Sequence, residues 1–278
     1  MVNTSALHGM TTGFLHPGAM GASLASTCRG VRVWCGEGRS EATRARAIDA
    51  GMEDVGSLEV LVKRADVIIS VCPPGAAREV AAQVAAAGFS GIYVDVNAIS
   101  PATTRSIGEQ FPRFVDGGVV GPPVRSPGTT RLYLSGNDAA HIASLWSGTP
   151  LETRMVDGGA GAASAVKICF AAWTKASAAL LLTIRALADA EGVEDALLAE
   201  WATSMPGVAE QSQRAATNNA PKAWRFAGEL EEIAQSFSAH GLPDGFGTAA
   251  AETYRRLAGF KDTTGTSLDD VIQALAHS

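Results

Sequence analysis

Residues 13–25 read GFLHPGAMGASLA, in which an apolar strand-like run ends at a glycine-containing turn and a helix-like run follows. This order is typical of the entrance to a dinucleotide-binding site, where the turn normally reads G-x-G-x-x-G. His16 occupies the first glycine position, while Gly18 and Gly21 keep the second and third. We expect His16 to act as a turn residue, stiffened by Pro17, and a phosphate to bind at the start of the helix.

Short apolar runs alternate with helix-like runs through the first half of the chain. The strand-like runs cover residues 11–15, 31–34, 67–71, 92–96, 114–115 and 132–135, and the helix-like runs cover 19–27, 41–50, 58–63, 76–87 and 102–110. Continuously apolar strands in this alternation predict a mostly parallel sheet with helices on both faces. From Gly158 onward we find no strand pattern and expect helices over 161–192, 194–203, 206–217, 222–239, 246–258 and 267–276.

These patterns predict an α/β protein with two domains. A Rossmann-type, mostly parallel sheet domain that binds the dinucleotide covers residues 1–157, of which 1–9 form a loose extension. An all-helical domain for substrate binding and dimerisation covers residues 158–278. The apolar stretch within 161–192 is interrupted by Lys175 and preceded closely by Lys167, so it falls short of the roughly 20 apolar residues of a membrane span. We interpret it as a buried helix or a homodimer interface of the helical domain.

Composition excludes several classes of partner. The 278 residues carry a net charge of −6 without a dense cluster of Lys and Arg, which argues against nucleic acid and membrane surfaces. The four cysteines form no C-x-x-C pair, so we predict reduced thiols and no metal site. The first ten residues contain no apolar signal-peptide core, and we therefore expect a cytoplasmic protein that acts on a small molecule.

The residues after the second strand-like run concern the choice between NAD and NADP. Glu37 could bind a ribose 2′-hydroxyl group, which favours NAD. Arg39 with Ser40 could bind a 2′-phosphate, since a guanidinium group flanked by a hydroxyl suits a phosphate. The excess of arginine in this segment leads us to predict that NADP(H) is preferred over NAD(H).

Several segments together resemble the β-hydroxyacid dehydrogenases and 6-phosphogluconate dehydrogenases. They are GFLHPGAMG (13–21), VIISVCPP (67–74), YVDVNAISP (93–101), VDGGVVGPP (115–123) and GGAGAASAVKICFAAW (158–173). The second half is similar to a subgroup of this NADP-binding superfamily whose C-terminal helical domain has no known function. The resemblance covers nearly the whole chain and implies an NAD(P)-dependent oxidoreductase with an undefined substrate.

The resemblance assigns roles to individual residues. Lys167 falls on the catalytic lysine, which would act as general acid or base on a carbonyl–alcohol couple. The cofactor-binding positions are His16, Pro17, Gly18, Ala19, Met20, Gly21, Arg39, Ser40, Val71, Cys72, Pro73 and Asn97. The positions assigned to the substrate are Gly117, Gly118, Val120, Ser164 and Ala171.

Three features depart from the family pattern. Val120 replaces a serine of the substrate-binding stretch, and Ala171 replaces an asparagine four residues after the catalytic lysine. Glu229 and Leu230, or their neighbours in GELEEIA, replace a later Lys-Asp pair. A β-hydroxycarboxylate substrate is therefore not implied. Two alternatives to a carbonyl reductase remain open, an imine reductase-like enzyme and a non-catalytic nucleotide-binding protein. Lys167 argues against the first, because imine reductases usually carry another residue there.

Overall fold

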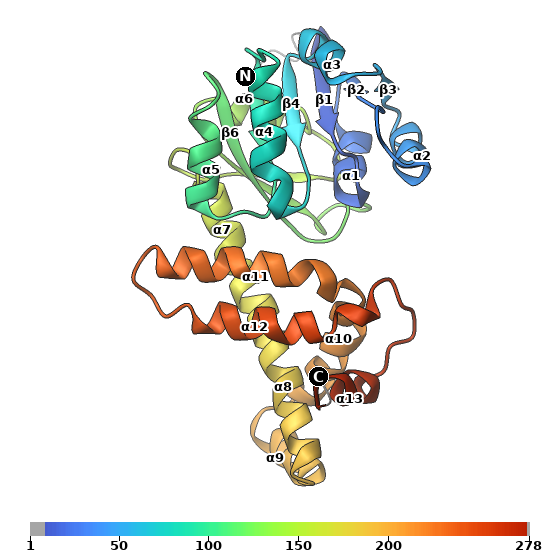
Figure 1. The fold of residues 1–278 in the computed structure, drawn as a ribbon, viewed down its shortest axis with the longest axis vertical. Coiled ribbons are helices and arrows are strands. Elements are labelled where there is room, and N and C mark those ends of the chain that lie inside the picture. The colour runs from blue at the N-terminus through green and yellow to red at the C-terminus, as the bar shows by residue number, and fades with distance from the viewer. Residues whose placement is uncertain (1–8, 277–278) are drawn as a thin grey trace. The chain divides into compact units, whose positions relative to one another are not determined.

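The computed structural model describes residues 9–276 and divides the chain into two compact units between Ile168 and Cys169. Unit 1, up to Ile168, contains the described strands, and unit 2, from Cys169, is helical (Figure 1). The change of composition at Gly158 predicts an earlier boundary. The structure differs because the first turns of helix α7 (Ala162–Ala171) are hydrogen-bonded to unit 1. Most of the predicted loose extension over 1–9 lies outside the described residues.

Unit 1 is built on an eight-stranded sheet with the strand order β3-β2-β1-β4-β5-β6-β7-β8. Its strands are β1 (Thr11–Leu15), β2 (Val31–Trp34), β3 (Glu53–Asp54), β4 (Val67–Ser70), β5 (Ile92–Asp95), β6 (Phe114–Val120), β7 (Arg131–Ser135) and β8 (Glu152–Met155). Neighbouring strands are parallel except β6 and β7, which pair antiparallel. The predicted Rossmann-type, mostly parallel sheet is confirmed.

Helices cover both faces of this sheet, and each face has its own apolar core. One face carries α1 (Ala19–Thr27), α2 (Glu41–Asp49) and α6 (Ala139–Ser144), and the other carries α3 (Leu58–Arg64), α4 (Ala77–Ala86) and α5 (Pro101–Gly108), with the short turn η2 (Pro74–Ala76) before α4. Successive strand residues point to opposite faces, so Ile69 joins the first core and its neighbour Ile68 the second.

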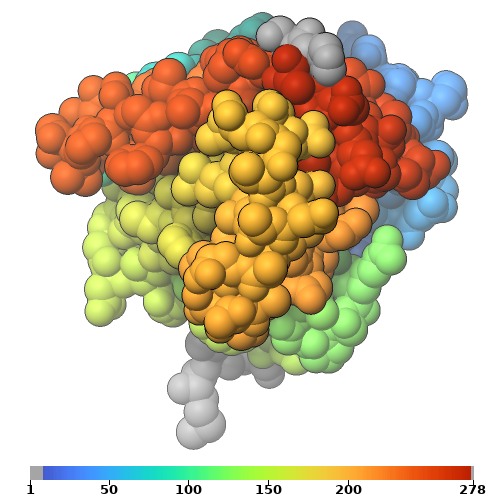
Figure 2. Space-filling view, turned by 90° about the horizontal axis from the view of Figure 1, so that it is seen from below, coloured from blue at the N-terminus to red at the C-terminus, as the bar shows by residue number. Residues whose placement is uncertain are grey.

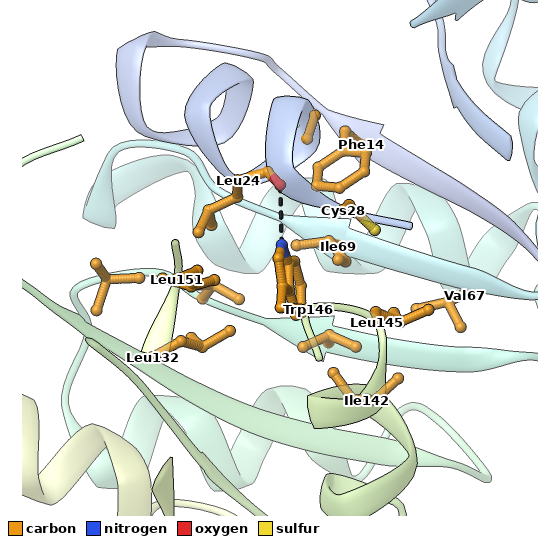
Figure 3. Packing of buried hydrophobic residues seen from close by; sticks show 14 of the residues in the cluster. Phe14, Leu24, Cys28, Val67, Ile69, Leu132, Ile142, Leu145, Trp146 and Leu151 are labelled. Atoms are coloured by element: carbon orange, nitrogen blue, oxygen red, sulfur yellow. Dashed lines mark hydrogen bonds between the residues drawn. The ribbon is translucent and has the colours of Figure 1, made fainter. Parts of the chain in front are cut away.

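The first core fixes helix α1, which follows the glycine turn. Figure 3 shows Trp146 packed among Leu24, Leu145 and Leu151, with its indole Nε1 donating a 3.0 Å hydrogen bond to the carbonyl oxygen of Leu24. A buried tryptophan contributes a large apolar surface, and its one N–H needs a partner when it leaves water. Trp146 therefore anchors α1, although it lies 122 positions after Leu24 in the sequence.

The register of the parallel strands aligns four residues in one row. Leu15 pairs with Ser70, Ser70 with Asp95, and Asp95 with Asp116. Residues that follow this row therefore meet at the carboxyl edge of the sheet, where open α/β folds bind ligands. The glycine turn, the segment 71–73, Asn97 and Gly118 all follow it.

Unit 2 contains the end of α7 and the helices that follow it. The helices after α7 are the π-helical segment η3 (Ala172–Ala176), α8 (Ser177–Ala190), α9 (Glu194–Ser204), α10 (Val208–Asn219), η4 (Ala220–Lys222), α11 (Ala223–Ser238), α12 (Gly245–Arg256), η5 (Ala258–Phe260) and α13 (Leu268–Ala276). Helix α8 packs against α10, α12 and α13. In Figure 2 the yellow-to-orange atoms of α8 adjoin the red atoms of the C-terminal helices on one face of this unit.

The helical stretch Ala162–Ala190 is long and apolar enough to cross a membrane, judged by length and composition alone. Its part in unit 2 buries a charged group. Arg185 is 6% exposed, donates to the hydroxyl oxygen of Ser212 at 2.8 Å and forms an ion pair with Glu194. A buried guanidinium needs such partners, and both partners come from other helices of the same unit. One side of α8 therefore packs within unit 2, whereas Leu180 and Leu187 on the same helix are exposed.

Candidate functional site

The turn after β1 has the geometry that a dinucleotide site needs. His16 adopts a left-handed backbone with φ of 56°, and its carbonyl oxygen accepts a 2.6 Å hydrogen bond from the N–H of Gly18. Gly18 precedes α1, whose first turn has no side-chain cap and no acidic residue. The N-terminal N–H groups of a helix attract anions, so the start of α1, with Ala19, Met20 and Gly21, suits a pyrophosphate.

A pocket of about 160 Å³ lies between this turn and the segment after β2. His16, Cys35, Glu37 and Arg39 provide its polar side, and residues of α3 and α4 such as Leu58 and Val80 provide its apolar side. The Nε atom of Arg39 is buried without a hydrogen-bond partner among the described residues. A buried unsatisfied donor is costly, so this guanidinium is suited to an anionic ligand.

The side chains of the other arginines of this segment, Arg44 and Arg46, form contacts with other residues of the chain. Arg44 forms a 3.1 Å ion pair with Asp54 and also donates to the carbonyl oxygen of Gly36. Arg46 donates from Nε to the carbonyl oxygen of Pro17 at 3.2 Å and from Nη2 to the hydroxyl of Thr43 at 3.0 Å. Arg39 is therefore the arginine of residues 39–46 that faces the pocket, while Arg46 ties the glycine turn to α2.

Ser40 lies beside Arg39 at the start of α2. Its hydroxyl oxygen accepts a 3.3 Å hydrogen bond from the N–H of Thr43 and is 3.1 Å from the hydroxyl of Thr43. This N-cap role stabilises the helix in itself. The structure thus gives Ser40 a helix-capping role, and its contact with a 2′-phosphate stays a prediction.

At the next strands, Asn97 connects two loops of the sheet edge. Its Oδ1 accepts a 2.6 Å hydrogen bond from the N–H of Cys72, and its Nδ2 donates to Ser70 at 3.1 Å and to Asp95 at 2.9 Å. The side chain is 2% exposed. The resemblance assigns Val71, Cys72, Pro73 and Asn97 to the cofactor, and the structure brings these residues together at one edge. Asn97 fixes the arrangement of this loop pair.

Asp95 is a buried carboxyl group beneath this edge, and reasoning from the sequence missed it. Burial raises its pKa to about 7, against the opposing effect of the hydrogen bonds from Asn97, and the charge of Asp116 raises it further. Burial also raises the pKa of the Cys72 thiol to about 11. A thiol with a raised pKa is a poor nucleophile near neutral pH, so we assign Cys72 no nucleophilic role.

Helix α7 lies directly on strand β6. A Cβ atom built on Gly118 would be 2.7 Å from the carbonyl oxygen of Ala163 and 3.0 Å from Cβ of Lys167. A Cβ atom on Gly117 would be 3.0 Å from the side chain of Val96. Both glycines are therefore required for close packing, and their contact with a substrate stays a prediction.

Asp116 holds the start of α7 from within the sheet. Its Oδ2 accepts hydrogen bonds from the N–H groups of Gly161 and Ser164, both at 2.9 Å, and its Oδ1 accepts one from the Ser164 hydroxyl at 2.6 Å. Ser135 donates to the same carboxyl group at 3.2 Å. Burial raises the pKa of Asp116, while these hydrogen bonds lower it. The carboxyl group thus caps the helix that carries Lys167.

The sequence pattern predicts that Lys167 lies in the helical domain, but in the structure it belongs to unit 1. It is half-buried, one turn beyond Ser164, and its Cβ faces Gly118 on β6. Asp95 of β5 pairs with Asp116 of β6. Asn97 and Gly118 each follow their aspartate by two residues, so they lie at the same level of the sheet edge. The structure therefore brings Lys167 to the strand next to the loop pair that Asn97 connects.

The remaining predicted substrate residues are buried. Val120 is 3% exposed at the end of β6, Ser164 is committed to Asp116, and Ala171 is 4% exposed and belongs to unit 2. No group of three or more His, Cys, Asp or Glu suited to a metal ion occurs within residues 9–276.

Unit 2 contains a buried ion pair that the sequence pattern did not indicate. Lys175 in the π-helical segment pairs with Glu229 of α11, and the two side chains are 12% and 14% exposed. The ammonium nitrogen lies 4.6 Å from the ring centroid of Phe226. Burial lowers the pKa of Lys175, against the charge of Glu229, which raises it. π-Helical segments are frequent at functional positions.

Comparison with known proteins places these features in a family context. Residues 188–257 match the domain of unknown function DUF1932. A curated relative, an uncharacterized 28.5 kDa protein of Methanothermus fervidus, is 34% identical over 167 residues. That alignment covers 59% of this chain and 64% of the relative, a little under two thirds of its length.

Solved structures share the fold along most of the chain. A conserved protein of unknown function, described as structurally similar to 3-hydroxyacid dehydrogenases, is 28% identical, with 90% of this chain and 98% of that chain covered and a TM-score of 0.69. The 3-hydroxyisobutyrate dehydrogenase of Mycobacterium tuberculosis is 18% identical, with coverages of 96% and 99% and a TM-score of 0.68. A reductive aminase of Aspergillus terreus in complex with NADPH is 16% identical, with coverages of 95% and 99% and a TM-score of 0.55.

The class is therefore a Rossmann-type protein with a helical C-terminal unit, as in 3-hydroxyacid dehydrogenases. The resemblance to the β-hydroxyacid dehydrogenase-like NADP-binding superfamily, in the subgroup with a C-terminal domain of unknown function, is confirmed.

Proposed function

We propose that the protein is an NADPH-dependent oxidoreductase that reduces a small carbonyl compound or oxidises the corresponding alcohol. The observation that carries this proposal is the packing of Lys167 on Gly118, on the strand beside Asn97 and the cofactor edge. A nucleotide-binding protein without catalysis has no need of a lysine at that place, whereas hydride transfer to a carbonyl group requires a proton donor there.

The residues of unit 1 fit a dinucleotide. The start of α1 would hold the pyrophosphate, and Arg39 would bind a 2′-phosphate of the adenosine part through a guanidinium group that is now unsatisfied at Nε. Val71, Cys72, Pro73 and Asn97 would line the nicotinamide end. NADPH, when bound, supplies the hydride.

Lys167 would then supply the proton. When hydride reaches the carbonyl carbon, negative charge develops on the oxygen, and a nearby ammonium group stabilises that charge and donates a proton to it. Asp116 keeps this lysine in place, because it caps the helix start one turn before Lys167. The substrate role predicted for residues 158–278 remains part of this proposal.

We also propose that the protein forms a homodimer through unit 2. An apolar groove of about 1090 Å³ runs along α8 and α12, and Trp173, Leu180, Leu187 and Phe246 are exposed in it. Exposed apolar patches of this kind usually mark protein–protein interfaces. In our proposal, a second copy of the chain covers this face. We also propose that the enzyme acts in the cytoplasm.

The test is a substrate survey of the purified protein. NADPH oxidation would be followed by absorbance with a panel of oxo acids, aldehydes, ketones and cyclic imines, in wild type, in Lys167→Met and in the surface control Lys63→Met. Turnover of a carbonyl compound that Lys167→Met loses and Lys63→Met keeps supports the proposal. Turnover of imines alone, undiminished in Lys167→Met, supports the imine reductase alternative, and binding without any turnover supports a non-catalytic protein.

A further inference from the structure

His16 is an unusual residue at an unusual backbone position. Within residues 9–276, only His16 and Asp262 combine a side chain with a left-handed backbone, and His16 stands where dinucleotide-binding turns normally have glycine. A side chain there costs conformational energy that glycine avoids. Backbone strain of this kind concentrates at ligand-binding positions. The imidazole therefore calls for a role beyond the turn itself.

The surroundings of the imidazole suggest that role. His16 lines the pocket between the turn and the segment after β2, together with Arg39, the arginine that faces this pocket. Arg46 holds the turn against α2 through the carbonyl oxygen of Pro17. The turn that carries His16 and the segment that carries Arg39 are thus fixed to each other on two sides of one small pocket.

We propose that His16 is a second ligand of the 2′-phosphate of NADP(H), beside Arg39, and that it takes up a proton when this phosphate binds. This inference rests on the proposed cofactor. It extends the proposed function, since it makes the discrimination between NADPH and NADH dependent on pH. The proton moves from solvent to the imidazole, which then donates a hydrogen bond to a phosphate oxygen.

Electrostatics favour a neutral imidazole before the nucleotide binds. Burial, reinforced by the charge of Arg39, lowers the pKa of His16 to about 4. The other titratable groups of the pocket are Cys35 and Glu37, and the lining residues from α3 and α4 are uncharged. A phosphate with nearly two negative charges would offset both the loss of hydration and the repulsion by Arg39, and so favour the imidazolium form.

The experiment is isothermal titration calorimetry of the full-length protein with NADPH and with NADH. Titrations at about pH 6.5 in two buffers with different ionisation enthalpies give the number of protons bound. The matched variant is His16→Asn, because asparagine tolerates the left-handed backbone but cannot bind a proton near neutral pH. His16→Gly serves as the second variant and restores the usual residue of the turn.

We expect wild type to take up more protons with NADPH than either variant, and to bind NADPH about tenfold more tightly than they do at pH 6.5, the scale of a hydrogen bond to a charged group. NADH should bind equally to all three. The partial protonation of the free phosphate near pH 6 is the same in every titration. Equal proton uptake by wild type and both variants would overturn the inference. If wild type binds neither nucleotide, the proposed function itself fails, which is a different outcome.

Discussion

Gly118 of β6 and Lys167 of α7 lie in direct contact, because a Cβ atom on Gly118 would come within 3.0 Å of Cβ of Lys167 and within 2.7 Å of the Ala163 carbonyl oxygen. The absence of a side chain at one position thus determines the place of the candidate catalytic group at the other. The contact also explains why the helix start belongs to unit 1.

The first prediction concerns this contact. Gly118→Ala should push α7 away from β6 and destabilise the protein by about 1–3 kcal/mol, the usual cost of overpacking. Turnover should fall further than stability alone explains, because Lys167 moves with the helix. Chemical denaturation and steady-state kinetics measure both effects. Gly159→Ala is the control, since a Cβ atom there meets nothing within 4 Å; equal behaviour of the two variants would contradict the prediction.

The second prediction concerns the proton donor. Lys167→Ala should lower kcat by about 10²–10⁴, the usual contribution of general acid catalysis, and leave the affinity for NADPH nearly unchanged. Lys167→Arg should also be slow, because a guanidinium group keeps its proton near neutral pH. Stopped-flow measurement of hydride transfer, with NADPH affinity from fluorescence titration, separates the two quantities. Near-wild-type turnover of Lys167→Ala on a carbonyl substrate would rule out the assigned role.

Much of the sheet could be predicted from the sequence. Strands β1, β2, β4 and β5 begin where predicted, because central parallel strands are buried on both faces and so form continuous apolar runs. Strand β8 (Glu152–Met155) was missed. It is an edge strand with a polar, partly exposed sequence, and an edge strand needs pairing on one side alone. The helices of unit 2 lie close to their predicted limits, and the apolar periodicity that predicts them is strong in α10 to α13.

The site was only partly predictable. The glycine turn carries a local signal, whereas Asp116 contacts residues 161–164 from more than 40 positions away in the sequence. An aspartate followed by two glycines gives no local sign of a buried helix cap. Strand β6 was predicted to cover only residues 114–115, but it extends to Val120. Its glycines have low strand propensity, and the packing of α7 against the strand explains why they are there.

The third prediction concerns cofactor choice. Arg39→Ala should weaken NADPH binding by about 1.5–3 kcal/mol, the scale of a hydrogen bond to a charged group, and leave NADH nearly unaffected. Equilibrium titration with each nucleotide tests this. Glu37→Gln is the paired variant from the same pocket. Equal losses for both nucleotides in Arg39→Ala would remove Arg39 from 2′-phosphate recognition, and a wild type that prefers NADH would point to Glu37.

The fourth prediction concerns pH and Asp95. Its pKa is raised to about 7 in the folded protein, so between about pH 4 and pH 7 the folded state binds more protons than the unfolded state. Its contribution to stability must therefore decrease as pH rises through that range. Asp95→Asn removes this contribution, and its stability relative to wild type should improve from pH 5 to pH 7.5 in urea denaturation. A stability difference that is independent of pH would show that Asp95 does not titrate in this range.

The last prediction concerns the apolar groove of unit 2. Leu180 is exposed in this groove beside Leu187, and a charge there would be buried if a second copy of the chain covered the face. Burying an unpaired carboxylate costs several kcal/mol, so Leu180→Glu should convert the proposed dimer into a monomer that remains folded. Light scattering after size-exclusion chromatography gives the mass, and circular dichroism reports the fold. Leu242→Glu is the matched control, because Leu242 is exposed but does not line the groove. A monomeric wild type, or a dimer that persists in Leu180→Glu, would place the interface elsewhere or remove it.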